Sequence, residues 1–94
     1  MVQIGYIKLN LSANWINSLK DRRQVAQKLR DKIKNDFNAS VKLIYPESIR
    51  TFELYIVLLS DASDYIYQVS DQIEATAQTQ FDLNVTMEVD VDRW

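Results

Sequence analysis

The amino-acid sequence predicts an α+β domain whose elements follow one another in the order β-α-β-β-α-β. Four segments alternate apolar and polar residues with the period of two that is typical of strands. Two longer segments have apolar residues three and four positions apart, which is the spacing of an amphipathic helix. The 94 residues, 47% of them hydrophobic, suit one domain with one core.

The first strand is expected over residues 3–11, where two faces alternate. One predicted face consists of Gly5, Ile7, Leu9 and Leu11. The other consists of Ile4, Tyr6, Lys8 and Asn10, and this mixture predicts a strand that is buried on one side only.

The first helix is expected over residues 18–37, a segment that holds seven of the eleven Lys and Arg residues. Ser18 followed by Asp21 resembles a capping box, in which each side chain bonds the backbone N–H of the helix start. The predicted inward stripe consists of Leu19, Ala26, Leu29, Ile33 and Phe37.

The second and third strands are expected over residues 39–46 and 51–60. Pro46 has no backbone N–H to donate, so it should end the second strand at a sheet edge. Residues 51–60 are the most apolar segment and should form a central strand. Its predicted buried face consists of Phe52, Leu54, Ile56 and Leu58, and its outward face of Glu53, Tyr55, Val57 and Leu59.

The second helix is expected over residues 60–80, with Ser60 or Asp61 as its N-cap and Asp64 in its first turn. Its predicted stripe consists of Ile66, Val69, Ile73 and Ala77. The last strand, over residues 83–92, sets Leu83, Val85, Met87, Val89 and Val91 against Thr86, Glu88, Asp90 and Asp92.

Two right-handed crossovers with a hairpin between them give a ferredoxin-like fold for residues 1–94. We expect a four-stranded antiparallel sheet in the order 4-1-3-2, with both helices on one face. The other face of the sheet would be left open.

Charge is divided unevenly along the chain. Residues 1–50 carry ten basic and four acidic side chains, a net charge of +6, and residues 51–94 carry one basic and nine acidic, a net charge of −8. This division suggests a charged partner or association between opposite faces of two copies. The alternative is that the two halves interleave in the fold and neutralise each other locally.

Several residue types are scarce. Cysteine and histidine are absent and Gly5 is the one glycine, so thiolate chemistry, imidazole bases and glycine-rich phosphate loops are excluded. We therefore expect no enzymatic activity and no cofactor. Glu88, Asp90 and Asp92 could attract a hard cation, but we interpret them as charges that protect an edge strand and expect no metal.

The absence of cysteine, of a signal peptide and of a long apolar run predicts a cytoplasmic protein without a membrane segment.

The first helix offers a candidate nucleic-acid surface. At 100° per residue several cations fall along the flanks of the helix, where they could follow a phosphate backbone. The alternative is a solvated helix flank. The candidate residues are Lys20, Arg22, Arg23, Arg30 and Lys34.

The open sheet face offers a candidate interface. Paired aromatics such as Tyr6 and Tyr55 stack bases in an RRM, but Thr51 stands where the signature of that domain has glycine. The face is more apolar than a lone domain needs, which favours a protein–protein or homodimer surface. The candidate residues are Ile4, Tyr6, Ile44, Tyr55 and Val57.

The N-terminal half resembles the YlxP-like family of small bacterial proteins. The residues that carry this resemblance are Ser18, Leu19, Lys20, Asp21, Arg22 and Arg23, followed by Lys34, Asn35, Asp36, Phe37, Asn38, Ala39, Ser40 and Val41. The connection after the first strand and the segment "LIYPESIRTFE" depart from the family pattern. The resemblance implies a ferredoxin-like, cytoplasmic bacterial protein whose family is uncharacterised. Genes of this family often neighbour those of translation initiation and ribosome maturation factors, which implies ribosomal RNA or the small ribosomal subunit as a partner.

These observations lead to one functional hypothesis and two alternatives. The first is a non-enzymatic accessory protein that contacts the ribosome or another RNA through the first helix. The second is a homodimeric interaction module that associates through the open sheet face. A small-ligand sensor is a more distant third.

Overall fold

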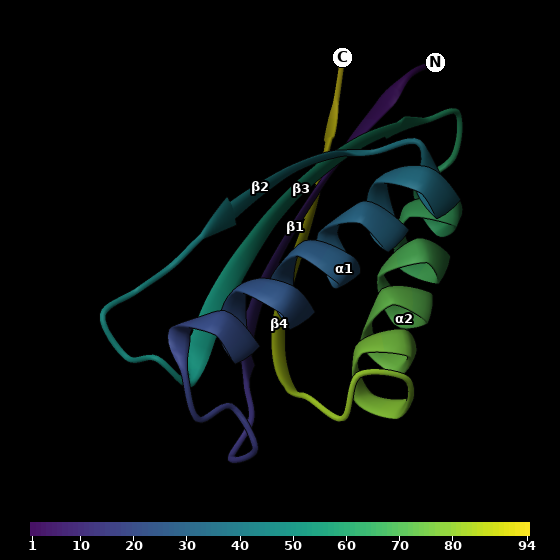
Figure 1. Cartoon of the computed structure of the whole chain (residues 1–94). Coiled ribbons are helices and arrows are strands. Elements are labelled where there is room, and N and C mark those ends of the chain that lie inside the picture. The colour runs from purple at the N-terminus through teal and green to yellow at the C-terminus, as the bar shows by residue number, and fades with distance from the viewer.

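The computed structural model describes all 94 residues, and its elements follow the predicted order (Figure 1). The elements are β1 (Gln3–Ser12), α1 (Leu19–Phe37), β2 (Ser40–Ile44), β3 (Thr51–Ser60), α2 (Ser63–Thr79) and β4 (Asn84–Arg93). Neither helix has the length and apolarity needed to cross a membrane.

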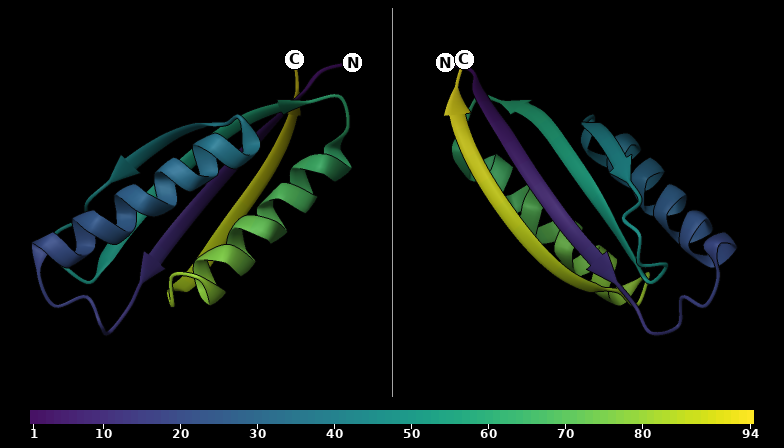
Figure 2. Two further views of the ribbon diagram at one scale, coloured as in Figure 1. Left: turned by 45° about the vertical axis from the view of Figure 1, so that its right-hand side comes forward. Right: turned by 90° about the vertical axis from the view of Figure 1, so that its left-hand side faces the viewer.

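The four strands form one antiparallel sheet in the order β2-β3-β1-β4. This is the predicted ferredoxin-like order read from the other edge, so the prediction is confirmed. β1 pairs along its whole length with β3 on one side and β4 on the other. Both helices lie on one face of the sheet, and Figure 2 shows the strands in front of them when the opposite face is turned to the viewer. The second face is therefore open.

The core lies between the sheet and the two helices and contains 19 buried apolar residues. Alternation decides which strand residues enter it, since Ile7, Leu9 and Leu11 are buried while their neighbours in sequence are not. Gly5 occupies the same face at the point where α2 crosses β1. A Cβ atom there would lie 2.6 Å from Cγ2 of Ile66, so the absence of a side chain allows α2 to approach the strand closely.

α1 begins as predicted. The Asp21 N–H donates to Oγ of Ser18 over 3.0 Å, and the Asp21 carboxylate accepts from the Asn17 N–H over 3.1 Å. The inward stripe differs at one end, because Leu19 is 59% exposed. The prediction for Leu19 is wrong because Arg22, one turn later, takes the inward position there. The remaining stripe consists of Val25, Ala26, Leu29 and Ile33, with Phe37 half-buried.

α2 begins later than predicted. Its N-cap is Ala62, and no side chain caps the first turn. Ser60 cannot serve as the cap because its hydroxyl is used within the connection, where it donates to the Ala62 carbonyl and accepts from the Ala62 N–H. The inward stripe is confirmed and gains Ser70, whose hydroxyl donates to the Tyr67 carbonyl over 2.8 Å.

Strand ends differ slightly from the prediction. β2 is shorter, because Asn38 adopts a left-handed conformation with φ of 51° at the end of α1 and pairing stops two residues before Pro46. β4 begins and ends one residue later than expected. Leu83 is buried although it precedes the strand.

Two tryptophans join distant parts of the chain at opposite ends of β1. The indole N–H of Trp15 donates to the Asp82 carbonyl over 3.0 Å, which ties the β1–α1 connection to the α2–β4 connection. At the other end, the Trp94 N–H donates to the Val2 carbonyl over 3.0 Å and extends the β1–β4 ladder.

Candidate functional site

Charge is separated in space as well as along the chain. α1 packs on β2 and β3, and α2 packs mainly on β4, so the two helices lie over opposite edges of the sheet on the same face. α1 carries seven basic and three acidic residues, whereas α2 carries three acidic and no basic ones. β4 adds three carboxylates and one arginine. The two halves of the sequence therefore do not interleave at the outer sides of the molecule.

Four cations form a line along α1, which we call the basic ridge: Lys20, Arg23, Arg30 and Lys34. Spacings of three, seven and four residues keep them on one flank of the helix. Lys20, Arg23 and Lys34 are exposed. Arg30 is partly buried, and its Nε lies 3.0 Å from Oδ1 of Asp31.

The basic ridge lies on the flank of α1 that points away from α2. The opposite flank carries Asp21 and Lys28, which line a shallow hollow together with Phe81 and Asp82 from the segment after α2. Helical spacing places the ridge across the helix from this hollow, above the edge of the sheet formed by β2. No carboxylate other than that of Asp31 contacts a cation of the ridge.

Arg22 has a different position and a different partner from the ridge. Its Nη1 donates to the carbonyls of Pro46, Ser48 and Thr51 over 2.8, 3.0 and 3.4 Å, and its guanidinium lies 4.6 Å from the centre of the Tyr45 ring. These contacts hold the β2–β3 connection against α1, so we leave Arg22 out of the candidate nucleic-acid surface. The one signal of this role in the sequence is that helical spacing places Arg22 near the inward stripe of α1.

The open sheet face brings together all five residues of the candidate interface. Tyr6, Tyr55 and Val57 are each about 40% exposed. Leu59 lies on the same face and is 57% exposed, so it belongs to this surface although we did not select it from the sequence. The apolar residues that β1, β2 and β3 place on the open face are Ile4, Tyr6, Ile44, Tyr55, Val57 and Leu59.

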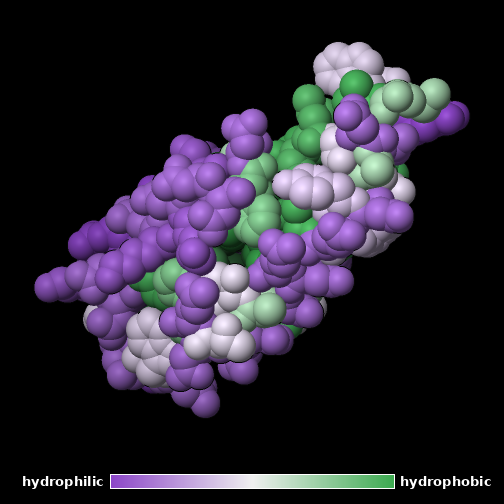
Figure 3. Space-filling view, turned by 90° about the vertical axis from the view of Figure 1, so that its right-hand side faces the viewer, coloured by the Kyte–Doolittle hydropathy of each residue, from purple (hydrophilic) through white to green (hydrophobic).

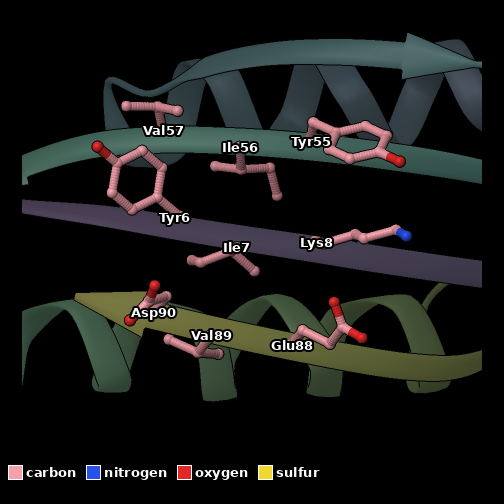
Figure 4. Close-up of a pocket in the computed structure, with 9 residues that line it drawn as sticks. All are labelled: Tyr6, Ile7, Lys8, Tyr55, Ile56, Val57, Glu88, Val89 and Asp90. Carbon is pink, nitrogen blue, oxygen red and sulfur yellow. The ribbon is translucent and has the colours of Figure 1, made fainter. Parts of the chain in front are cut away.

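A shallow hollow of about 200 Å³ lies at the centre of this face (Figure 4). Tyr6 and Tyr55 stand at its two ends, and Glu88 and Asp90 form its wall on β4. The hollow is smaller than the usual small-molecule pocket of roughly 300 Å³ or more. It is better suited to receiving side chains of a partner than to enclosing a ligand.

Lys8 and Tyr55 lie side by side at one end of this hollow (Figure 4). Nζ of Lys8 lies 5.5 Å from the centre of the Tyr55 ring, and the Tyr55 hydroxyl donates to Oε1 of Glu53 over 3.0 Å. The interaction with Tyr55 is the largest cause of a raised pKa for Lys8, and Glu53 and Glu88 also raise it. Lys8 therefore places a positive charge between Tyr55 on β3 and Glu88 on β4.

The carboxylates of β4 interact with their own strand. Oδ1 of Asp90 accepts from the Val91 N–H over 2.9 Å, and Oδ1 of Asp92 accepts from the Arg93 N–H over 2.8 Å. These bonds occupy backbone donors that an additional strand would need. The structure contains no group of three or more acidic, cysteine or histidine side chains arranged to hold a metal.

Apolar side chains also gather at the end of the molecule where the two termini lie (Figure 3). Met1 and Trp94 are 78% and 83% exposed there. This end adjoins the open face through a second hollow that Ile4, Leu59 and Trp94 line. The exposed apolar surface is therefore continuous from the centre of the open face to the termini.

Solved structures of similar shape show the fold and nothing more, because their sequence identity to this chain is low. A de novo designed protein, Foldit4, has 12% identity and a TM-score of 0.58, and the alignment covers 100% of this chain and 99% of that one. SnoaB, a cofactor-independent oxygenase from Streptomyces nogalater, has 8% identity and a TM-score of 0.55 over 98% of this chain and 92% of that one.

A VAO-type flavoprotein from Myceliophthora thermophila C1 has 11% identity and a TM-score of 0.66 over 96% of this chain, which spans 16% of the length of that protein. No curated protein matches the sequence. A family model does match, over residues 4–89, and its description is "Protein of unknown function (DUF503)".

Proposed function

The chain belongs to the DUF503 family of proteins of unknown function, and we propose that it is a non-enzymatic accessory protein that contacts RNA through the basic ridge. We propose further that it is a YlxP-like protein of the bacterial cytoplasm and that its partner is ribosomal RNA or the small ribosomal subunit. The observation that supports the RNA contact best is the line of cations on the flank of α1 that faces away from the acidic side of the molecule.

The basic ridge has dimensions that suit a phosphate backbone. Lys20 and Lys34 are fourteen residues apart on one helix, which corresponds to about 21 Å at 1.5 Å per residue. Several consecutive phosphates of one strand fall within that length. Contacts of this kind position a protein on RNA without reading its sequence.

The acidic side of the molecule supports the same proposal, because it limits the orientations in which the domain could bind a nucleic acid. α2 and β4 together carry six of the thirteen carboxylates and a single cation, and they lie at the other edge of the sheet from the ridge. Phosphates would repel that side, so a nucleic acid would approach α1 preferentially. The charge separation therefore gives this small domain one favoured docking orientation.

Binding to small ribosomal subunits over a series of salt concentrations tests this proposal. If four cations contact phosphates, we expect the affinity to fall about a hundredfold between about 50 and 200 mM salt. Arg23→Glu/Arg30→Glu should abolish binding. Lys28→Glu/Lys32→Glu is the matched control, because it changes the net charge equally but on the other flank of α1, and it should retain most of the affinity.

Either of two results would contradict the proposal. One is that the folded wild-type protein does not bind small subunits or their RNA at low salt. The other is that the two double variants lose affinity equally, since this would mean that net charge and not the ridge is responsible. Circular dichroism of each variant establishes that it is folded.

A second candidate function is that of a homodimeric interaction module. It is favoured by the exposed apolar surface of the open face, which extends from Tyr6 and Tyr55 to the end of the molecule that carries Trp94. Isolated domains seldom leave a continuous apolar surface uncovered. The two candidate functions use opposite faces of the domain, so one protein can have both.

A further inference from the structure

We infer that two copies of this chain pair through their open sheet faces, about a twofold axis that runs parallel to the strands between β1 and β3. The inference rests on the second candidate function and adds the arrangement of the two copies. It is carried by the register of the sheet, which places side chains of opposite character at positions that such an axis would bring together.

The open face is organised in rows that cross the four strands in the order β2-β3-β1-β4. The central row contains Lys42, Tyr55, Lys8 and Glu88, because Tyr55 pairs with both Lys42 and Lys8, and Lys8 pairs with Glu88. A cation thus stands at one end of the row and an anion at the other. If a second copy of the row is laid over the first in the opposite order, the cation at one end of each copy faces the anion at the end of the other copy.

Rotation about an axis parallel to the strands produces that reversal. β2 of one copy then faces β4 of the second copy, and β3 faces β1. Lys42 would lie opposite Glu88 of the second copy, and symmetry repeats the pair. Tyr55 would lie opposite Lys8 of the second copy, so the contact between a cation and an aromatic ring that exists within each copy also fits between copies.

The neighbouring rows are complementary in the same way. In the row toward the termini, Val57 would face Tyr6 of the second copy, since these residues pair across β3 and β1. One row farther, Leu59 would face Ile4. Apolar side chains therefore meet apolar side chains on the exposed part of the face.

The row on the other side of the centre is polar. Glu53 pairs with Asn10 across β3 and β1, so these two residues would face each other between copies. A carboxylate would meet an amide that can donate to it. Each of these rows thus pairs with its own reversed copy without bringing like charges together.

Other ways of joining two copies are less favourable. An axis perpendicular to the strands would place β4 against β4, and Glu88, Asp90 and Asp92 would face the same carboxylates in the second copy. Pairing of β4 edges would require the Val91 and Arg93 N–H groups, which Asp90 and Asp92 already occupy. Charge and hydrogen bonding therefore both select the axis parallel to the strands.

The size of the face suits a reversible dimer. Three strands of ten residues and one of five give a face of about 500 to 600 Å² at usual strand spacings. Two copies would bury about 1,100 Å² in total, which is near the lower end for specific interfaces. We therefore expect the dimer to dissociate on dilution.

A charge exchange tests the axis, with sedimentation velocity over a dilution series as the measurement. Glu88→Lys alone and Lys42→Glu alone each create two repulsive contacts per dimer, and each should weaken dimerisation by about tenfold or more. The double variant Lys42→Glu/Glu88→Lys restores the opposite pairs and should dimerise within about threefold of wild type. Lys34→Glu, which makes the same charge change on α1, is the control and should dimerise normally.

The outcomes test separately whether the open face forms the dimer and whether the twofold axis runs parallel to the strands. A folded wild-type protein that stays monomeric at high concentration would overturn both this inference and the second candidate function. A dimer that Val57→Asp disrupts, but that neither single charge variant weakens, would keep the open-face interface and overturn the axis. Val57→Asp is also expected to leave small-subunit binding through the basic ridge intact, so failure of the RNA proposal would be recognised separately.

Discussion

Two sides of the molecule can be compared, one built from α1 and β2 and the other from α2 and β4. Their buried residues are arranged alike, whereas their surface charges are opposite. Each helix places four or five buried residues on the same face of one sheet. Outside, α1 is basic and α2 acidic, α1 has a side-chain cap and α2 has none. The comparison teaches that inward positions determine the fold of this domain, whereas outward positions determine which partners each side can meet.

The largest effects are expected from variants that create a cavity in the core under each helix, and these variants test whether the two sides are equally well packed. Leu29 in α1 and Ile73 in α2 are both fully buried at 0% exposure. We expect Leu29→Ala and Ile73→Ala each to lower the free energy of unfolding by about 3 kcal/mol, within the usual range for such truncations. Urea unfolding measures both, and a difference of more than about 2 kcal/mol would show that the two sides are not equally packed.

A smaller effect is expected from the close approach of α2 to β1, which has no counterpart at a glycine under α1. Gly5 lets α2 approach β1, and a Cβ there would lie 2.6 and 3.1 Å from the two γ carbons of Ile66. We expect Gly5→Ala to lower stability by about 1 to 3 kcal/mol, since α2 must move or Ile66 must leave its rotamer. Ser12→Ala, near the other end of β1, is the control. Unchanged thermal unfolding of Gly5→Ala would mean that α2 shifts without loss.

A comparison of neighbouring arginines tests the division of roles within α1. Arg22→Lys keeps the charge but loses the planar guanidinium that bonds three carbonyls and stacks on Tyr45. We expect it to cost about 1 to 2 kcal/mol and to speed amide exchange in the β2–β3 connection. Arg23→Lys, on the exposed ridge, should leave both measurements near wild type. Equal effects would contradict the structural role of Arg22.

The smallest expected effects concern the helix starts. Ser18→Ala should destabilise the protein by about 1 kcal/mol, because the Asp21 N–H loses its acceptor. Ala62 has the extended backbone of an N-cap but no oxygen to accept a bond, so Ala62→Asp should stabilise by a similar amount. Thermal unfolding should show shifts of about 4 to 8 °C in opposite directions. A destabilised Ala62→Asp would mean that the connection around Ser60 cannot accommodate the new side chain.

Most of the fold could be predicted because it depends on local periodicity. The alternation from Ile7 to Leu11 and the stripe from Ile66 to Ala77 each follow from spacing within one segment. The incorrect details concern competition between partners. Leu19 is exposed because Arg22 takes the inward position, and Ser60 is not the cap because it bonds Ala62.

The candidate surfaces could be predicted as lists of residues but not as arrangements. Periodicity placed Tyr6 and Tyr55 on one face, whereas the row that joins Lys42 to Glu88 depends on the register of four strands. Register arises from contacts between residues far apart in the chain, and no local pattern contains it. The same reason explains why the bond between Trp15 and Asp82 could not be predicted.

The position of β1 in the sheet also has a consequence for how the chain folds. β1 precedes the other three strands of this sheet in the chain, yet one of its edges stays without a partner until β4 is made, since Gln3 pairs with Arg93. Contacts between segments so distant are slow to form, and mixed α/β domains of this kind fold more slowly than helical bundles. The β2–β3 hairpin, α1 and β1 should therefore assemble early, and docking of β4 should complete the domain. Until then the nascent protein exposes a strand edge that chaperones can shield and that other nascent chains can join.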